Sequence, residues 1–187
     1  MPETSEVKAE ASSELSQDDV RVWNELWVSA HNDHYACVYE ESVAEFLVAR
    51  WRLVDTVAKF CTALTTGGST VAAWAFWNTS VGHRVWAIVS GVAAVIALVH
   101  MSLGITERIK EDTLIYATFQ QLRLDLEILK KKMRLKQSDS LTVYLNDYLD
   151  ITAKFGKAYA LKRPDFFLTV KREKIIQADI NTRLGLN

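Results

Sequence analysis

Two long segments without Asp, Glu, Lys or Arg lie near the middle of this 187-residue chain and constrain its fold more than any other feature. Residues 60–82 form the first, with 23 residues, and residues 85–106 form the second, with 22. At a rise of ~1.5 Å per residue each segment reaches about 33 Å as a helix, enough to cross a hydrocarbon core of ~30 Å. The sequence therefore predicts an all-α membrane protein with a two-helix transmembrane hairpin, spanning about 60–80 and 85–106, rather than a soluble globule.

The basic residues around this hairpin predict its orientation. Those that flank it on the outside are Arg50, Arg52, Lys59, Arg108 and Lys110. The short link between the two segments carries Arg84 alone. Because loops rich in Lys and Arg stay on the cytoplasmic side, we expect a multi-pass protein of the cell inner membrane with both termini in the cytoplasm. The N-terminus is acidic and polar to about Gln17, so we expect no cleaved signal peptide.

The segment before the hairpin divides into a tail and a helix. Residues 1–17 lack hydrophobic periodicity and are rich in Glu, Ser and Ala, which predicts a disordered tail. Residues 18–59 predict a cytosolic pre-membrane helix that begins after Ser16, since a hydroxyl can cap the free amides and two acids follow at once. No Pro or Gly occurs between this start and Gly67, so the helix is expected to continue into the first span.

The cytosolic part after the hairpin, residues 107–187, begins with a stalk that carries a heptad pattern. The second span lacks breakers and is expected to run past Gly104 into this stalk as one helix. Apolar residues alternate at steps of four and three at Ile115, Phe119, Leu122, Leu126, Leu129 and Met133. We expect them to form the seam of a homo-oligomer. A second stripe follows the same helix at Leu114, Ala117, Leu124, Ile128 and Leu135. A two-stranded coil would leave this stripe in water, so an oligomeric multi-helix bundle is the better prediction.

Two shorter helices and a separation of charge complete the cytosolic part. The pattern predicts helices over about 141–159 and 167–184, with Pro164 between them and Gly185 at the end. The chain before the first span carries a net charge of −7, and the chain after the second carries +5. These flanks can attract each other, within one protomer or between protomers.

The first span holds hydroxyl side chains that hydrocarbon cannot satisfy. They are Thr62, Thr65, Thr66, Ser69 and Thr70, with Gly67 and Gly68 between them. One interpretation is close helix packing, since small residues four apart let two backbones approach. The other is a pore wall, where hydroxyls replace part of an ion's hydration shell. Both can hold in one oligomer.

His100 is the only ionisable group deep in either span. In a symmetric antiparallel hairpin it is level with Thr65 and Thr66, whose hydroxyls can exchange a hydrogen bond with its ring. An ionisable residue inside a membrane is a functional-site hypothesis by default. A neutral histidine packed against these threonines is the alternative.

The remaining polar clusters favour neither catalysis nor metal binding. His31 and His34 have a helical metal-ligand spacing but no third ligand nearby, and His34 falls on an apolar stripe, so we expect a core histidine, no metal and no cofactor. The basic run 130–132, with Arg134 and Lys136, is interpreted as a solvated face, or as a site for an anionic partner or the acidic N-terminal segment. It lacks stacking aromatics, so we expect no nucleic acid. Phosphate-binding glycine loops and nucleophile elbows are missing, so we do not expect an enzyme.

Several of these features occur together in a recognisable order. They are Arg50-Trp51-Arg52 with Asp55, the small residues 67–73, the brief link and the pair Glu107-Arg108. This order resembles the SLATT family, the SMODS and SLOG-associating two-transmembrane effectors of prokaryotes. The resemblance implies a pore-forming or membrane-perturbing effector of an antiviral conflict system, triggered through a second-messenger synthase or a sensor protein. The alternative, from another class, is a membrane-anchored scaffold module that recruits a cytosolic enzyme without conducting.

Overall fold

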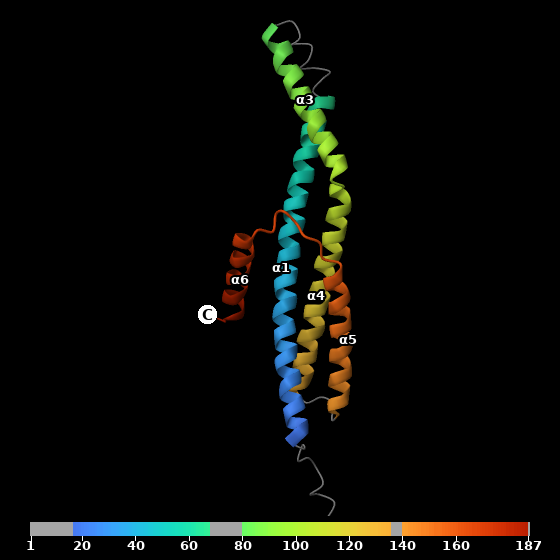
Figure 1. The fold of residues 1–187 in the computed structure, drawn as a ribbon, viewed down its shortest axis with the longest axis vertical. Coiled ribbons are helices and arrows are strands. Elements are labelled where there is room, and N and C mark those ends of the chain that lie inside the picture. The colour runs from blue at the N-terminus through green and yellow to red at the C-terminus, as the bar shows by residue number, and fades with distance from the viewer. Residues whose placement is uncertain (1–16, 68–79, 136–139, 187) are drawn as a thin grey trace, which may run out of the picture. The chain divides into compact units, whose positions relative to one another are not determined.

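The structure, a computed structural model, describes residues 17–67, 80–135 and 140–186. Within these residues the chain forms five α-helices and no strand, so the predicted all-α class is confirmed (Figure 1). The helices are α1 (Gln17–Gly67), α3 (Ser80–Ser102), α4 (Ile105–Leu135), α5 (Leu141–Ala160) and α6 (Val170–Leu184).

Helix α1 is a single helix of 51 residues. Its first turn holds Asp18 and Asp19, whose charges suit the positive end of the helix dipole. The predicted cap, Ser16, lies outside the described residues. The helix continues without a break to Gly67, which confirms the expectation that nothing local interrupts it before that residue.

The expectation of one continuous helix from the second span into the stalk is wrong. Helix α3 ends at Ser102 and α4 begins at Ile105. Gly104 between them has a φ of 55°, in the left-handed region that a glycine adopts without strain because it lacks a Cβ atom. The Leu103 amide still donates to the Val99 carbonyl at 2.9 Å, so the end of α3 is satisfied by a tight turn. Hydrophobic pattern alone did not reveal this break.

The ends of the last helix follow the predicted signals more closely. The Thr169 hydroxyl accepts a hydrogen bond from the Arg172 amide at the start of α6. Gly185 closes the helix with a φ of 67°, as its position predicted. Helix α6 starts three residues later than expected, because the Asp165 carboxylate accepts the Phe167 amide at 2.9 Å and holds this stretch out of the helix.

The contacts of the chain divide it into two compact units, each built from segments far apart in sequence. Unit 1 consists of Met1–Val38 and Phe119–Leu161. It contains the first part of α1, the last part of α4, and α5. Unit 2 consists of Tyr39–Thr118 and Lys162–Asn187 and contains the rest of α1, with α3, the start of α4, and α6. Each unit is described separately below.

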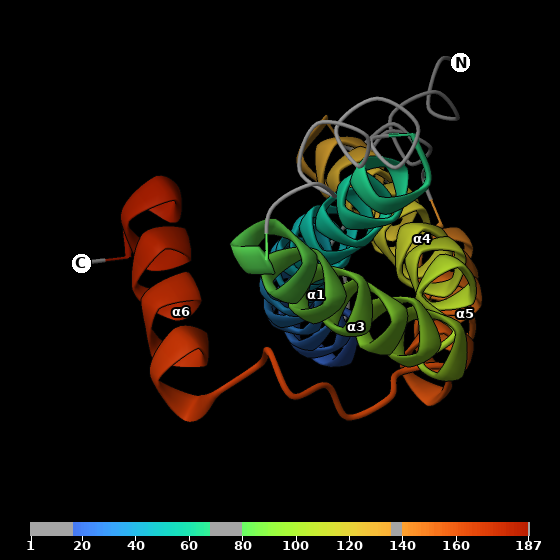
Figure 2. The same cartoon turned by 90° about the horizontal axis from the view of Figure 1, so that it is seen from above.

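The core of unit 1 is made largely by the predicted seam. Its buried members are Phe119, Leu122, Leu126, Leu129 and Met133 on α4, with Leu26, Ala30 and Cys37 on α1 and Tyr144, Ile151 and Ala158 on α5. Figures 1 and 2 show these parts of α1, α4 and α5 side by side. The seam is therefore covered within the chain itself, because α1 and α5 bring apolar faces that the heptad pattern could not foresee. The second stripe stays exposed at Leu124, Ile128 and Leu135.

The core of unit 2 gathers around one tryptophan. Val43, Leu47 and Trp51 of α1 are buried together with Ile105 of α4. Partly buried side chains that pack against them come from α1, α4, α6 and the chain before α6: Tyr39, Phe46, Val54, Ile109, Phe167, Leu168 and Ile176. Ile115, the sixth predicted seam residue, lies in this unit and is half-buried.

Helix α3 differs from the others in its surface. Its stretch Arg84–Ser102 is the one segment among the described residues that is long and apolar enough to cross a membrane, and only 6% of it is buried. The exposed large side chains on α3 are Val81, Val85, Ile88, Val89, Val92, Val95, Leu98, Val99 and Met101. Residues 68–79 of the expected first span lie outside the described residues, so the two-span hairpin is carried forward as a proposal.

Candidate functional site

Charged and aromatic side chains gather in unit 2 near the C-terminal end of α3. They come from α1, α3, the start of α4 and the segment 162–169 that leads into α6, called the strap below. Two carboxylates organise them, Asp55 on α1 and Asp165 in the strap. We call this set of side chains the junction.

Asp55 joins α1 to α3 through His100. Its Oδ1 atom lies 2.9 Å from Nε2 of His100, and its Oδ2 atom accepts a hydrogen bond from Nζ of Lys59 at 2.6 Å. The side chains of Asp55 and His100 are 14% and 23% exposed, so this contact is largely shielded from water. Nε2 of His100 carries the shared proton, since an ionised carboxylate can only accept.

The hydrogen bond of His100 corrects the expected register of the hairpin. The symmetric hairpin placed His100 level with Thr65 and Thr66, whereas its partner is Asp55, ten residues earlier on α1. A carboxylate is a stronger partner than a hydroxyl for an imidazole N–H, because the bond is charge-assisted. The side chains of Thr65 and Thr66 lie outside the described part of the chain, as do Ser69 and Thr70.

Thr62 is the one predicted pore or packing hydroxyl of the first span whose side chain is described. Its Oγ1 atom donates to the Ala58 carbonyl in the preceding turn, at 2.9 Å. A hydroxyl satisfied within its own helix can face lipid, protein or water. This contact is compatible with both interpretations of the first span.

The charge of Asp55 is stabilised by its neighbours. Hydrogen bonds from Lys59 and then from His100 lower the pKa of this carboxyl below its ordinary value, against the smaller effect of burial. Asp55 is therefore ionised throughout the neutral range, and it is a fixed negative charge at the end of α3.

Asp165 clamps the strap onto α1 and α4. Its side chain is 2% exposed, and Oδ2 accepts hydrogen bonds from Nε1 of Trp51 at 2.8 Å and from Arg108 at 3.2 Å. The Arg108 guanidinium also lies 5.5 Å from the Trp51 ring centroid, a distance suited to a cation–π contact. Trp51 meets Phe166 and Phe167 edge to face, with centroids 5.3 and 5.1 Å away. These contacts fix the strap from two sides.

Two further ion pairs hold the start of the strap. Lys162 lies 2.6 Å from Glu40 of α1, a carboxylate that is 9% exposed, and Arg163 lies 3.1 Å from Glu111 of α4. The strap therefore contacts α1 and α4 at every charged position it has. The sequence predicted a helix stop at Pro164 but not this clamp.

In the part of the chain that the structure describes, Asp112 is the junction carboxylate that lacks a full set of hydrogen bonds. Its Oδ2 atom is buried and has no hydrogen-bond partner among the described residues. Burial, followed by the negative charge of Asp165, raises its pKa to about 6, and Arg108 offsets part of this effect. Asp112 is thus the junction carboxyl that changes charge near neutral pH.

The histidines of unit 1 form no comparable site. His34 is buried in the core, as predicted, with Nε2 at 3.5 Å from Glu127, which also accepts a hydrogen bond from Arg123. Burial and the nearby Lys130 lower the pKa of His34. His31 is exposed. Among the described residues no group of three His, Cys, Asp or Glu side chains could hold a metal ion.

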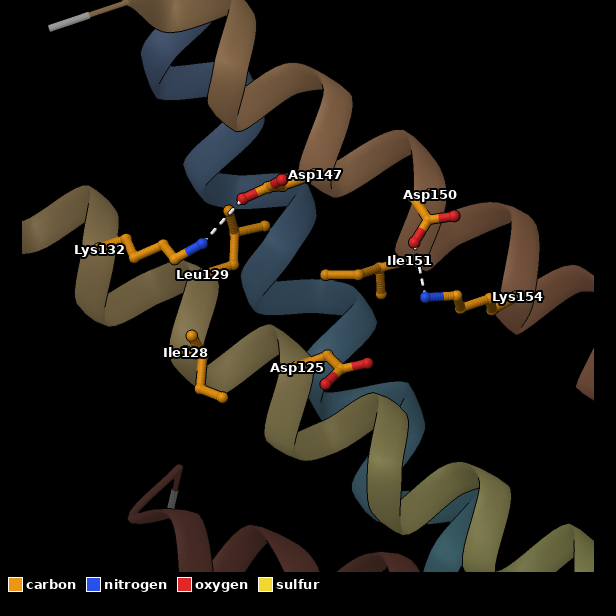
Figure 3. Close-up of a pocket in the computed structure, with 8 residues that line it drawn as sticks. All are labelled: Asp125, Ile128, Leu129, Lys132, Asp147, Asp150, Ile151 and Lys154. Atoms are coloured by element: carbon orange, nitrogen blue, oxygen red, sulfur yellow. Dashed lines mark hydrogen bonds and ion pairs between the residues drawn. The ribbon is translucent and has the colours of Figure 1, made fainter. Parts of the chain in front are cut away.

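A surface groove between α4 and α5 takes up part of the predicted basic run (Figure 3). Ile128, Leu129 and Ile151 line it with apolar atoms. Its charges are paired: Lys132 lies 3.0 Å from Asp147, and Lys154 lies 2.6 Å from Asp150. Asp125 accepts a hydrogen bond from Gln121 at 2.9 Å. Both lysines of the groove are thus paired with carboxylates, which does not favour binding of an anion there. We therefore place the candidate site at the junction.

Comparisons with protein-family models, with curated proteins and with solved structures found no match to the chain. The fold and the junction define a class in broad terms only. In its described residues the chain is all-helical, and one apolar helix able to span a membrane is joined at its end to a shielded network of charges.

Proposed function

We propose that the protein is a membrane effector that forms homo-oligomers and permeabilises the bilayer when its cytosolic helices receive a signal. In this proposal α3 and the segment 60–80 cross the inner membrane as a hairpin, and both termini are cytoplasmic. The proposal follows the SLATT resemblance, with a second-messenger synthase or a sensor protein as the source of the signal. It assigns the chain no enzymatic activity.

The observation that carries the membrane part is the exposed apolar surface of α3. Its large side chains face outward along the whole helix, and only 6% of the spanning stretch is buried. Such side chains contribute on the order of 0.3–0.6 kcal/mol each when a helix inserts into a bilayer. Contact of this apolar surface with water is unfavourable, so we expect it to be covered by lipid or by other copies of the hairpin.

The junction supports the signalling part. The strap and the start of α4 are held by Asp165, while Asp55 and Lys59 tie α1 to the end of α3 through His100. Both sets of contacts meet on the same length of α1, between Trp51 and Lys59. A shift of the strap would therefore act on the spans through α1, by the rigid-helix movements that switching proteins use.

Liposome leakage tests the proposal. Purified protein reconstituted with its activating partner is expected to release a small dye from vesicles. The variant Asp55→Asn removes a junction charge and should change the release, whereas Asp150→Asn, which breaks an exposed ion pair within α5, should not.

Vesicles that stay sealed under conditions where the protein and its partner are toxic in cells would contradict the pore. That result would favour the scaffold alternative, in which the helices recruit a cytosolic enzyme. In the scaffold, a charge placed on the face of Thr65 and Ser69 would harm assembly but would never change conductance.

A further inference from the structure

The outer face of the strap exposes large apolar side chains on a fixed backbone. Phe166 is 65% exposed and Val170, the first residue of α6, is 69% exposed. The residue between them on the core side, Phe167, packs against Trp51 at a centroid distance of 5.1 Å. Because Asp165 holds the strap in place, the exposure of Phe166 is not the result of a loose chain end.

The strap lies at the level where α3 ends. Trp51 shares a core with Ile105, which is separated from the end of α3 only by the turn at Leu103 and Gly104. The polar layer of each leaflet is about 5–7 Å thick. The ring centroid of Phe166 is 5.3 Å from that of Trp51. With α3 in the hydrocarbon, Phe166 falls at the depth of the lipid headgroups.

We propose that the strap and the first residue of α6 form a membrane-interface anchor, in which Phe166 and Val170 insert among the lipid headgroups of the cytoplasmic leaflet. The occupant of this exposed surface is thus the bilayer itself, continuous with the lipid around α3. This inference rests on the proposed membrane insertion of α3.

Charge and residue type agree with a lipid surface. Phe is among the side chains that interfacial segments bury at the boundary between headgroups and acyl chains. The exposed basic residues Arg52, Arg163 and Lys171 flank the exposed apolar pair along the chain and in the adjoining helix α1. Basic groups near an anionic leaflet strengthen binding to the membrane surface. An anionic lipid surface can bind both the exposed apolar side chains and the basic residues beside them.

Spin labels at single cysteines test the depth of the strap. Cys37→Ala and Cys61→Ala remove the native thiols, and three variants then carry one label each: Phe166→Cys, Val92→Cys on α3, and Leu184→Cys at the end of α6. Helix α6 runs away from the end of α3 (Figure 1), and Arg172 near its start lies over Phe46 of α1. Leu184 is therefore the aqueous control.

The labelled proteins are reconstituted in vesicles of phosphatidylcholine with phosphatidylglycerol, and the label is relaxed by oxygen or by a water-soluble nickel chelate. The label at 166 is expected to lose more than half of the nickel accessibility seen at 184, while oxygen accessibility rises toward the value at 92. Unchanged helical circular dichroism shows that each variant is folded: the labelled positions are exposed, and the cysteine-free parent controls for Cys37→Ala in the core.

Nickel accessibility at 166 equal to that at 184, with 92 in lipid, would overturn the anchor and leave the membrane insertion of α3 standing. Shielding of 166 from both reagents would also overturn it, because a protein and not lipid would then cover the strap. Nickel access at 92 would contradict the proposed function itself.

Discussion

At the scale of single residues, a few buried carboxylates decide how unit 2 is held together. Asp165 accepts three hydrogen bonds while nearly all of its side chain is removed from water. Asp112, close by, is buried with an oxygen that has no partner among the described residues. One carboxylate therefore stabilises the fold and the other costs free energy.

Removing the Asp165 acceptor should be strongly destabilising. Asp165→Ala leaves the Trp51 indole N–H and the Arg108 guanidinium without their partner, at a cost of about 2–4 kcal/mol in the free energy of unfolding. Denaturation followed by circular dichroism in detergent measures this loss. The matched control is Asp179→Ala, which breaks the exposed pair with Arg183 and should change stability by less than about 0.5 kcal/mol. Equal effects of the two substitutions would contradict the clamp.

Asp112 should make stability depend on pH. Its pKa is raised from 3.8 to about 6 in the folded state, so the native protein binds more protons than the unfolded chain between these values. The free energy of unfolding should therefore be higher near pH 4 than at pH 7. The difference should disappear as the pH rises through about 6, where the folded protein releases the Asp112 proton. Asp112→Asn should flatten this dependence and stabilise the protein at pH 7 by about 1–2 kcal/mol, allowing for partial exposure. A slope that is the same in both proteins would refute the assignment.

At the scale of elements, the turn between α3 and α4 is set by one glycine. A Cβ atom on Gly104 would meet no neighbour, so the positive φ alone opposes other residues at this position. Gly156 in α5 is equally open but has ordinary helical geometry.

The two glycines should respond to alanine with opposite signs. Gly104→Ala forces a left-handed alanine and should lower the free energy of unfolding by about 1–2 kcal/mol. Gly156→Ala should raise it by about 0.5–1 kcal/mol, because alanine loses less backbone entropy in a helix. Thermal unfolding of both variants checks the pair, and a gain in stability at 104 would show that α3 and α4 are joined differently.

The two apolar stripes of α4 should also separate in experiment. Leu126 is fully buried and Ile128 is 52% exposed. Leu126→Ala leaves a cavity and should cost about 2–5 kcal/mol, whereas Ile128→Ala should have little effect on the fold of one chain. Crosslinking of the same variants shows which stripe serves the oligomer. Loss of the oligomer without loss of stability in Leu126→Ala would restore the predicted seam between protomers.

At the scale of the whole molecule, the near-zero net charge hides flanks of opposite sign. If these flanks draw protomers together, the proposed homo-oligomer should weaken as salt rises from 0.05 to 0.5 M, because screening shortens the Debye length to a few ångströms. Analytical ultracentrifugation in detergent measures the association. An oligomer insensitive to salt would mean that apolar contacts hold it and that the charge separation is incidental.

Much of the helical architecture was predictable because it depends on local signals. The absence of breakers predicted α1 up to Gly67, and Gly185 predicted the end of α6. Heptad spacing identified the buried face of α4, but not what covers it. His34 as a core residue followed from its place on an apolar stripe.

The junction was beyond prediction because its partners are far apart in sequence. Asp165 meets Trp51 across 114 positions, and His100 meets Asp55 across 45. No periodicity encodes such pairs, since they depend on which helix faces pack and at what register. The ten-residue error in the level of His100 arose from assuming a symmetric hairpin.

The amino-acid sequence alone determined the helical class, the apolar stretch of α3 and some helix ends, because hydrophobic period, caps and breakers act within a few residues. Tertiary structure decided that the α4 seam is satisfied inside the chain, that Gly104 interrupts the helix, and that Asp55, His100 and Asp165 form the junction. The difference has one physical cause. Burial and charge pairing depend on residues that are brought together in space. A pattern within one stretch of sequence does not indicate which distant residue will lie beside it.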